Sequence, residues 1–498
     1  MSASRLLVSN AAVSVVQTLI SGLLLFLLYR YLIDQLGSEK LGLWSVILAG
    51  TSVAKLSELG LAGSVVKFVA QARARDDDKQ VSAVIQTSAV SVAIAMALLT
   101  LAIYPLLGII LRASIPESAI ANAFLILPWA VLSLWIGSIA GVFQSALDGC
   151  HCIAVRNVIL IVANLLYFLA AFWLVPMHGL IGLAVGQVVQ GLLLVVLTWY
   201  FLKREVPALP WFPFQWSKKV FKEIFSYATN FQINSIAIML FEPATKLMIS
   251  KYGGLSSAAY YEMASQFIVK LRGLLVSASQ ALVPTVAGLH EKSPSDVSAL
   301  YLKTYRLIFL LCIPFFGALI VALPAVSTMW IGREESQFIQ FGVLLTIGWG
   351  FNSLSIPAYF FNLGTGNLTW NSVAHVLMAV LNTLLGVILG MNFGAQGVAF
   401  GVMVTLLLGS GFLIVNIKST NKLDVCALIP AESINILIFT ATFAVLFYWF
   451  SSYFYLFNSA VATGGIALLI YFVLFSGMAW FHPYKNLIMS RRKILVGG

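Results

Sequence analysis

Charged side chains are scarce in this sequence. They make up 9% of its 498 residues, whereas an average soluble domain carries about 25%. Apolar residues reach 60% and are spread along the whole length. This composition excludes a soluble globular enzyme, a disordered chain and a coiled coil, and no polar stretch is long enough to form an external domain. We therefore expect an all-α polytopic membrane protein.

Cysteine is also rare. The four residues Cys150, Cys152, Cys312 and Cys426 are too few and too scattered for a disulfide framework. The Cys150-His151-Cys152 triplet is too tightly spaced for a zinc site and no second Cys/His pair follows it, so we expect no metal. The net charge of +11 comes from basic residues between apolar spans. This placement favours a role in membrane topology over nucleic-acid binding.

Long apolar runs make up most of the sequence. A bilayer core of about 30 Å requires roughly 20 apolar residues per helix. The sequence predicts fourteen such spans, at about 9–33, 41–68, 81–111, 119–147, 154–176, 179–202, 225–250, 256–288, 303–330, 338–363, 369–391, 394–416, 430–452 and 457–481. Basic residues concentrate in alternate loops. The positive-inside rule therefore places both termini and residues 71–80, 203–222 and 289–302 in the cytoplasm.

The largest break in the apolar pattern lies at residues 203–224. It combines several prolines with Trp211, Trp216 and a group of lysines, which is typical of an amphipathic segment at the level of the lipid headgroups. The predicted division is a first lobe of six helices at 1–205, this linker at 206–224, a second lobe of six helices at 225–420, and two C-terminal helices with a basic tail at 421–498.

Internal similarity supports two equivalent lobes. The motif Gly-x-x-Gly-x-Ala-x-Gly opens the sixth span at Gly179 and the twelfth span at Gly394. Such glycine-notched helices allow close packing in lipid. An even number of spans per lobe makes this a parallel repeat about an axis along the membrane normal. The sequence thus predicts two pseudo-symmetric six-helix lobes.

Two further matches extend the repeat. Aligning Gly37 with Gly253 pairs Arg30 with Lys246 and Trp44 with Tyr260. A third match pairs Asn164 with Asn382. On this alignment, Arg30 and Lys246 occupy equivalent positions in the two lobes.

Ionisable residues at membrane depth are costly, so they are candidates for function. They concentrate in the first, second, seventh and eighth spans, at Arg30, Lys55, Glu58, Glu242, Lys246, Glu262, Lys270 and Arg272. The i,i+3 and i,i+4 spacings predict that Lys55 shares a helix face with Glu58, and Glu242 with Lys246. Lys270 and Arg272 are about 200° apart on a helix and cannot point the same way.

The start of the chain resembles a known family. The residues that carry the resemblance are Leu36-Gly37-x-x-x-Leu41-Gly42-Leu43-Trp44, Glu58-Leu59-Gly60-Leu61 and Val65-Val66-Lys67-Phe68-Val69-Ala70. They are similar to the polysaccharide-transporter family, which includes O-antigen (Wzx-type) flippases and belongs to the multidrug/oligosaccharidyl-lipid/polysaccharide (MOP) exporter superfamily. The resemblance implies a V-shaped, MATE-like pair of lobes that alternately exposes a central cavity. It also implies an undecaprenyl-diphosphate-linked oligosaccharide as cargo, in the bacterial inner membrane.

Within that framework, the membrane charges suggest a cationic cavity for the diphosphate. The substrate-binding candidates are Arg30, Lys55, Lys246, Lys270 and Arg272. Three carboxylates are candidates for coupling to a proton or sodium gradient, namely Glu58, Glu242 and Glu262. The rings that could stack on sugars are Trp44, Tyr260, Tyr261, Trp349 and Tyr359. The alternative interpretation is structural: ion pairs that let polar helices insert, Arg30 reaching the headgroups, and aromatic core packing.

Three other functions remain open at this point. A cation-coupled multidrug antiporter of the same superfamily would favour acidic cavities, and a lipid II flippase would share a cationic one. A membrane-embedded sugar enzyme would require a large outer loop, and the predicted outer loops are short. We therefore expect a transporter without catalytic residues or cofactor. Its expected partners are the lipid-linked oligosaccharide, membrane lipids, and a polysaccharide polymerase with its chain-length regulator.

Overall fold

The computed structural model describes residues 3–52, 61–212, 214–229, 232–280, 282–420, 428, 431–451 and 459–481. The regular structure in these ranges is helical, with no strand. The helices are α1 (Ala3–Ser52), α2 (Leu61–Arg73), α3 (Asp78–Ser114), α4 (Glu117–Gly149), α5 (Ile153–Glu205), α6 (Lys218–Thr229), α7 (Gln232–Ser279), α8 (Leu282–Lys292), α9 (Pro294–Ile331), α10 (Ser336–Leu354), α11 (Ile356–Thr365), α12 (Thr369–Thr420), α14 (Ala431–Ser451) and α15 (Ala460–Phe481).

Ten helical stretches among the described residues are long and apolar enough to cross a membrane. Four of them contain one glycine with non-helical backbone angles, at Gly37, Gly179, Gly254 and Gly394. All four have a positive φ between 57° and 82°, a region that glycine enters without the steric cost of a Cβ. Dividing the four stretches at these glycines gives fourteen apolar helical segments in the described part of the chain. The predicted all-α, polytopic fold class is confirmed.

The chain reverses direction at Gly179 and at Gly394. A Cβ atom on Gly182 would clash with the backbone carbonyl of Leu174, and one on Gly397 would clash with that of Leu389. The two halves of α5, and likewise of α12, therefore pack backbone against backbone. The close packing predicted from the glycine-notched motif is confirmed.

We expect Gly397→Ala to impair folding of the protein. The added methyl group would meet a backbone oxygen that cannot move without displacing a whole helix, and overpacking of this kind typically costs about 1–3 kcal/mol or more. Gly411→Ala is the matched control, because it lies in the same helix and has open space where its Cβ would be. Membrane protein level and unfolding temperature check the prediction, and equal values for the two variants would contradict it.

The two parts of the chain repeat each other's internal contacts. A Cβ on Gly149 would lie 2.7 Å from the Cβ of Val69, and a Cβ on Gly364 would lie 2.7 Å from the Cβ of Val286. The predicted internal repeat is therefore visible in the packing. The first contact joins α2 to the C-terminal end of α4, and the second joins α8 to the C-terminal end of α11.

The register of the repeat differs from the sequence alignment by one residue. The kink at Gly37 has φ 78° and ψ 170°, and its counterpart is Gly254, with φ 82° and ψ 174°, rather than the adjacent Gly253. On the corrected register Arg30 and Lys246 are not equivalent positions, so that part of the prediction is wrong.

The match of Asn164 with Asn382 is also wrong. Gly186 packs against Tyr167 and Ala170, whereas Gly401 packs against Leu385. Since Gly186 and Gly401 are equivalent in the glycine motif, the counterpart of Asn382 is Tyr167.

The chain divides into two compact units, Met1–Ala259 and Tyr260–Gly498, with the division inside α7. In the first unit α5 packs against both α1 and α4. A ladder of hydrogen bonds joins α1 to α5: Asn157 Nδ2 donates to Ser14 Oγ at 2.8 Å and Asn164 Nδ2 donates to Ser21 Oγ at 2.8 Å. Such amide–hydroxyl bonds hold helices together in lipid, where few other polar partners exist. The division into lobes at 205 and 224 stays a prediction.

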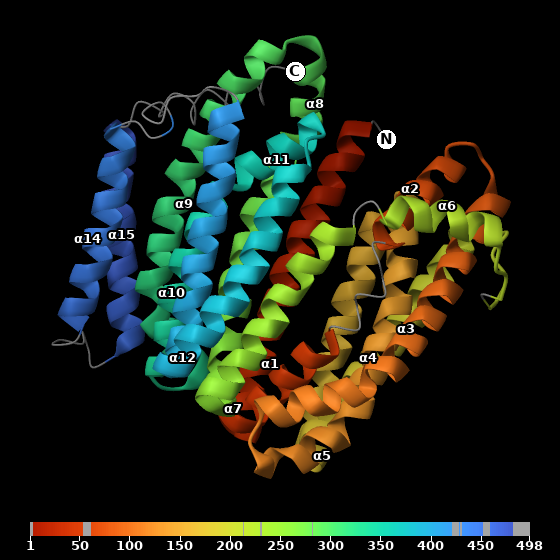
Figure 1. The fold of residues 1–498 in the computed structure, drawn as a ribbon, viewed down its shortest axis with the longest axis horizontal. Helices are drawn as coiled ribbons and strands as arrows, with labels where there is room; N and C mark the ends of the chain where they lie inside the picture. Colours follow the sequence, from red (N-terminus) through yellow and green to blue (C-terminus); the bar gives the residue numbers. More distant parts are fainter. Residues whose placement is uncertain are drawn as a thin grey trace. The chain divides into compact units, whose positions relative to one another are not determined.

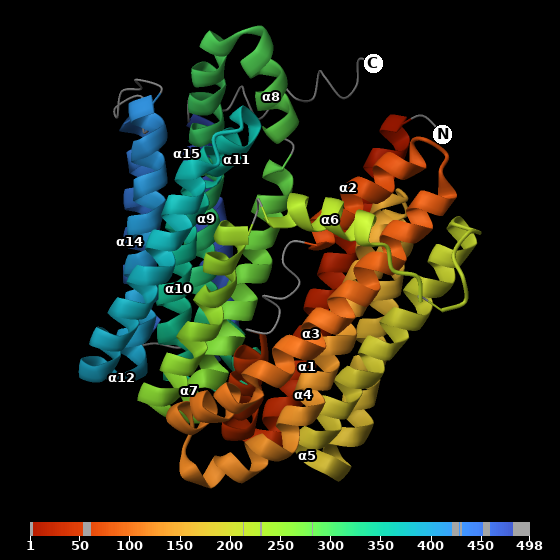
Figure 2. The same ribbon diagram turned by 45° about the vertical axis from the view of Figure 1, so that its right-hand side comes forward.

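The predicted linker belongs to the first unit. Its helix α6 packs on α2 and α3 and lies across their ends in Figure 2. Val220 and Ile224 are buried in the core of this unit. In the preceding loop, Trp216 donates through Nε1 to Ser91 Oγ at 3.0 Å, while Trp211 and Phe214 are 73% and 82% exposed. Exposed aromatic rings beside lysines agree with the predicted headgroup-level segment.

The second unit is built around α9. It contacts α10, α14 and α15, and Figure 1 shows α14 and α15, in blue, lying together. Tyr471 of α15 is fully buried and donates its hydroxyl to the carbonyl of Pro314 in α9 at 3.1 Å. The two C-terminal helices are thus tied to this unit through α9.

Candidate functional site

Arg272 lies inside the second unit among neutral and aromatic groups. Its Nη2 donates to Asn352 Oδ1 at 2.6 Å, and its guanidinium carbon lies 4.7 Å from the ring centroid of Trp349. Its Nε atom is buried and has no hydrogen-bond partner. Among the described residues no carboxylate pairs with it. A half-buried arginine with an unused donor and no counter-ion among the described residues is suited to bind an anion.

Helix α10 brings Trp349 and Asn352 to Arg272 because the i,i+3 spacing places them on one face. The amide of Asn352 is held from the other side, where Nδ2 donates to Ser410 Oγ of α12 at 2.8 Å. Close approach of α10 and α12 depends on Gly348, whose added Cβ would lie 3.1 Å from the Cα atom of Met403. Three helices, α7, α10 and α12, therefore define the cation site.

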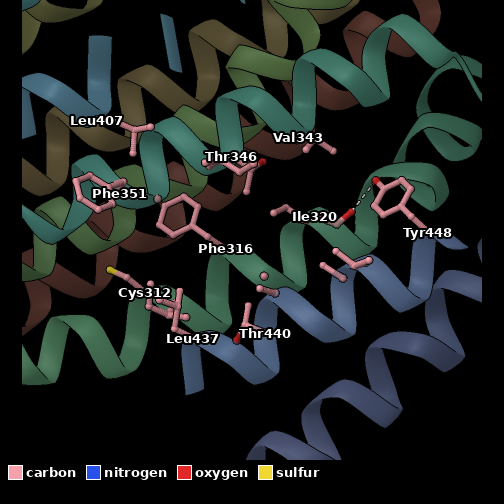
Figure 3. Close-up of a pocket in the computed structure, with 17 residues that line it drawn as sticks. Cys312, Phe316, Ile320, Val343, Thr346, Phe351, Leu407, Leu437, Thr440 and Tyr448 are labelled. Carbon is pink, nitrogen blue, oxygen red and sulfur yellow. Dashed lines mark hydrogen bonds between the residues drawn. The ribbon is translucent and has the colours of Figure 1, made fainter. Parts of the chain in front are cut away.

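An apolar cavity of about 640 Å³ lies in the same unit. Residues of four helices line it, as the close-up in Figure 3 shows: Cys312, Phe316 and Ile320 of α9, Val343, Thr346, Gly350 and Phe351 of α10, Leu407 of α12, and Leu437, Thr440, Ala444 and Tyr448 of α14. The hydroxyl of Tyr448 is occupied, because it donates to the carbonyl of Ile320 at 3.1 Å. All four helices are membrane-spanning candidates, so hydrocarbon is the material that suits this space.

The cation site and the cavity share two helices. On α10, Gly350 and Phe351 line the cavity, on a different face of the helix from Trp349 and Asn352. On α12, Leu407 lines the cavity and Ser410 lies three residues further along the same face. A charged site and a hydrocarbon-lined space therefore share α10 and α12 within one unit.

The candidates of the first unit form ion pairs. Lys246 Nζ lies 3.1 Å from Glu242 Oε1, which confirms the predicted shared face. Arg30 Nε lies 3.0 Å from Asp34 Oδ2. Asp34 was missed by the sequence analysis, although its i,i+4 spacing from Arg30 is visible there.

Two further predicted residues of α7, Glu262 and Lys270, differ from Arg272 in their surroundings. Glu262 is buried and accepts a hydrogen bond from Gln266 Nε2 at 2.9 Å. It lies ten residues before Arg272, about 15 Å along a helix. Lys270 is exposed, which agrees with the prediction that it and Arg272 point in different directions. Lys55 and Glu58 lie outside the described residues.

The predicted aromatic residues divide into two groups. Trp44, Tyr260 and Tyr261 are 3%, 4% and 2% exposed, so their rings contact protein in this structure. Trp349 covers the Arg272 guanidinium, and Tyr359 is partly buried with its ring centroid 5.8 Å from that of His375. Of the five rings, Trp349 is the one shown in contact with Arg272.

Sequence reasoning missed the polar residues of this site. Asn352 and Ser410 are uncharged, and they lie 80 and 138 residues along the chain from Arg272. The one available signal was the i,i+3 spacing of Asn352 from the candidate Trp349. His375 of α12 also has a buried Nε2 atom without a hydrogen-bond partner.

The Cys150-His151-Cys152 triplet lies between α4 and α5. Burial raises the pKa of the Cys150 thiol to about 11, so that sulfur is protonated at neutral pH. No group of three or more His, Cys, Asp or Glu side chains in the described part of the chain is arranged to hold a metal ion.

Comparison with known proteins places this geometry in a family. The chain is 24% identical over 277 residues to the uncharacterized membrane protein EpsK of Bacillus subtilis (strain 168), a match that covers 51% of this chain and spans half the length of that relative. Its fold is similar to that of the lipid II flippase MurJ in an inward closed conformation, with a TM-score of 0.75, 14% identity, and coverage of 97% of this chain and 100% of that one.

It is also similar to a multidrug resistance MATE family transporter of the MOP superfamily in an inward-facing conformation, with a TM-score of 0.67, 15% identity, and coverage of 80% of this chain and 95% of that one. These likenesses show the fold of the MOP superfamily of transporters. The model of the family described as polysaccharide biosynthesis protein matches residues 7–290, more than half of the sequence. The chain therefore belongs to this polysaccharide biosynthesis family.

Proposed function

We propose that the protein is a flippase that moves an oligosaccharide linked through a diphosphate to an isoprenoid lipid. It takes this lipid from the cytoplasmic to the outer leaflet by alternating access, for O-antigen, capsule or exopolysaccharide assembly. The observation that carries the proposal is the half-buried Arg272, whose buried Nε donor is unused and which has no carboxylate partner in the described part of the chain, in the same unit as an apolar cavity of about 640 Å³. Arginine suits the diphosphate, and the cavity suits the isoprenoid chain.

The neighbouring aromatic residues extend the proposal to the sugars. Trp349 on α10 lies over Arg272 and Tyr359 lies on the next helix, α11. Both would stack on the sugars next to the diphosphate. A cation-coupled multidrug antiporter is disfavoured because cationic cargo would be repelled by Arg272. The downstream partners would be a polymerase and a chain-length regulator, and coupling would use a proton or sodium gradient.

Deletion of the gene tests this function. We expect surface polysaccharide to disappear and lipid-linked sugar units to accumulate on the cytoplasmic leaflet, with drug resistance unchanged. Sensitivity to cationic dyes with intact surface polysaccharide would establish the antiporter instead. Arrest of cell-wall synthesis would establish a lipid II flippase.

The proposed orientation places both termini in the cytoplasm of a bacterial inner membrane. A cysteine introduced at Pro210 in the linker should not react with an impermeant maleimide added outside. A cysteine at His178, in the turn between the two halves of α5, should react. Labelling at 210 with none at 178 would reverse the orientation.

Variants of the Glu242–Lys246 ion pair in α7 distinguish a substrate-binding role for Lys246 from a structural role. If Lys246 binds the diphosphate, Lys246→Arg should keep most activity and Lys246→Ala should lose most of it. If the residue only neutralises Glu242, the Glu242→Ala, Lys246→Ala double variant should recover activity, because no unpaired charge is left. Surface polysaccharide and membrane protein level distinguish the two results. Recovery in the double variant would remove Lys246 from the binding site.

A further inference from the structure

A chain of hydrogen bonds runs from Arg272 through Asn352 to Ser410. Its first bond is 2.6 Å long and its second 2.8 Å, and the Asn352 and Ser410 residues are 7% and 0% exposed. Arginine can only donate, so the atom of Asn352 that faces it must be the amide oxygen. The amide nitrogen then faces Ser410, which accepts. The direction of both bonds is therefore fixed by chemistry.

This chain determines which edge of the guanidinium is free. Asn352 holds Nη2, and the Trp349 ring covers one face of the group. The edge that carries Nε has no protein acceptor. A guanidinium fixed at one corner and on one face presents its remaining donors in a constant direction, which favours a two-point contact with a phosphate.

We propose that Asn352 and Ser410 are positioning residues that make the Arg272 site select an anion. Asn352 orients the guanidinium and, because it is neutral, leaves the positive charge for the ligand. Ser410 accepts from the Asn352 amide nitrogen and so holds the amide, whose oxygen meets Arg272, in a fixed position. The inference rests on the proposed function, because the anion is the diphosphate of the lipid-linked saccharide.

The identity of residue 352 sets the charge of the site. Aspartate has nearly the same shape as asparagine. It would accept the hydrogen bond from Arg272 and would accept from the Ser410 hydroxyl instead of donating to it. Its negative charge would form an ion pair with Arg272 and compete with the ligand. A residue that only supports the fold would tolerate this change, because an ion pair replaces a neutral hydrogen bond.

Binding of undecaprenyl diphosphate to the purified full-length protein tests the proposal. We expect Asn352→Asp to weaken binding by roughly tenfold or more without lowering the unfolding temperature. Ser410→Ala should weaken binding by a smaller factor, and Ser410→Thr should restore it. The control is Asn362→Asp, which measures the effect of lost stability alone: Asn362 is also buried, and its Nδ2 donates to Asn371 Oδ1 at 2.8 Å, a bond that aspartate cannot make. The control should keep the affinity of the unaltered protein.

Two outcomes would overturn the proposal. Asn352→Asp binding as tightly as the unaltered protein would show that the charge at 352 does not matter. A loss of affinity that follows a loss of stability equally in Asn352→Asp and Asn362→Asp would show a structural role alone. Arg272→Gln, measured in the same assay, distinguishes an error in the headgroup site from an error in the positioning role. If Arg272→Gln also binds normally, the headgroup site itself is wrong, and if only Arg272→Gln loses binding, the positioning role alone is wrong.

Discussion

Replacing Arg272 with glutamine should abolish transport and leave the protein folded. The guanidinium supplies the one positive charge of a site whose other contacts, Asn352 and Trp349, are neutral. Charge-assisted hydrogen bonds contribute about 1.5–3 kcal/mol each, so losing the contact should weaken diphosphate binding by roughly 100-fold. Folding should not suffer, because a buried charge is costly to insert and glutamine keeps hydrogen-bonding capacity.

Arg272→Lys separates charge from geometry. Lysine keeps the charge but lacks the planar fork that reaches Asn352 and covers Trp349. We expect it to recover only a small part of the activity. Surface polysaccharide, membrane protein level and binding of an isoprenoid diphosphate measure these effects. Full activity in Arg272→Lys would mean that a point charge is enough, and full activity in Arg272→Gln would exclude the site.

Filling the apolar cavity should block transport of the intact lipid and spare the charged site. Ala444 lines the cavity on α14, and Ala444→Phe would place a ring in the space assigned to the isoprenoid chain. Each methylene group excluded from an apolar environment costs about 0.8 kcal/mol, so displacing two of them should reduce affinity by roughly tenfold.

Leu446→Phe is the control for this prediction. Leu446 lies on the same helix, is 56% exposed and does not line the cavity. The variant should transport normally. Both variants should also bind a short isoprenoid diphosphate with the affinity of the unaltered protein, since its headgroup contacts are intact. Equal transport by Ala444→Phe and Leu446→Phe would show that the cavity does not hold the chain.

The fold was largely predictable from the sequence because membrane insertion leaves strong local signals. Span length, the positions of basic loops and the glycine motif at Gly179 and Gly394 are all local features. The error of one residue in the repeat has a local cause as well. Gly253 and Gly254 are adjacent, and only the backbone angles show that Gly254 makes the kink.

The candidate site was predictable only in part. Arg272 is recognisable as a charge at membrane depth, and its divergence from Lys270 follows from helix geometry. Its partners are neutral residues on α10 and α12. They are far from Arg272 in the sequence, and nothing in the composition around them indicates a binding site. Tertiary packing also decides that Tyr260 and Tyr261 are buried, which ring chemistry alone does not reveal.

Transport in reconstituted vesicles tests the central claim most directly. The substrate is an undecaprenyl-diphosphate oligosaccharide with a fluorescent sugar, and an impermeant quencher added outside reports which leaflet holds it. We predict that vesicles containing the protein expose label from both leaflets, whereas vesicles with the Arg272→Gln variant expose only label of the outer leaflet, as protein-free vesicles do. Equal exposure with the unaltered protein and with protein-free vesicles would contradict the account.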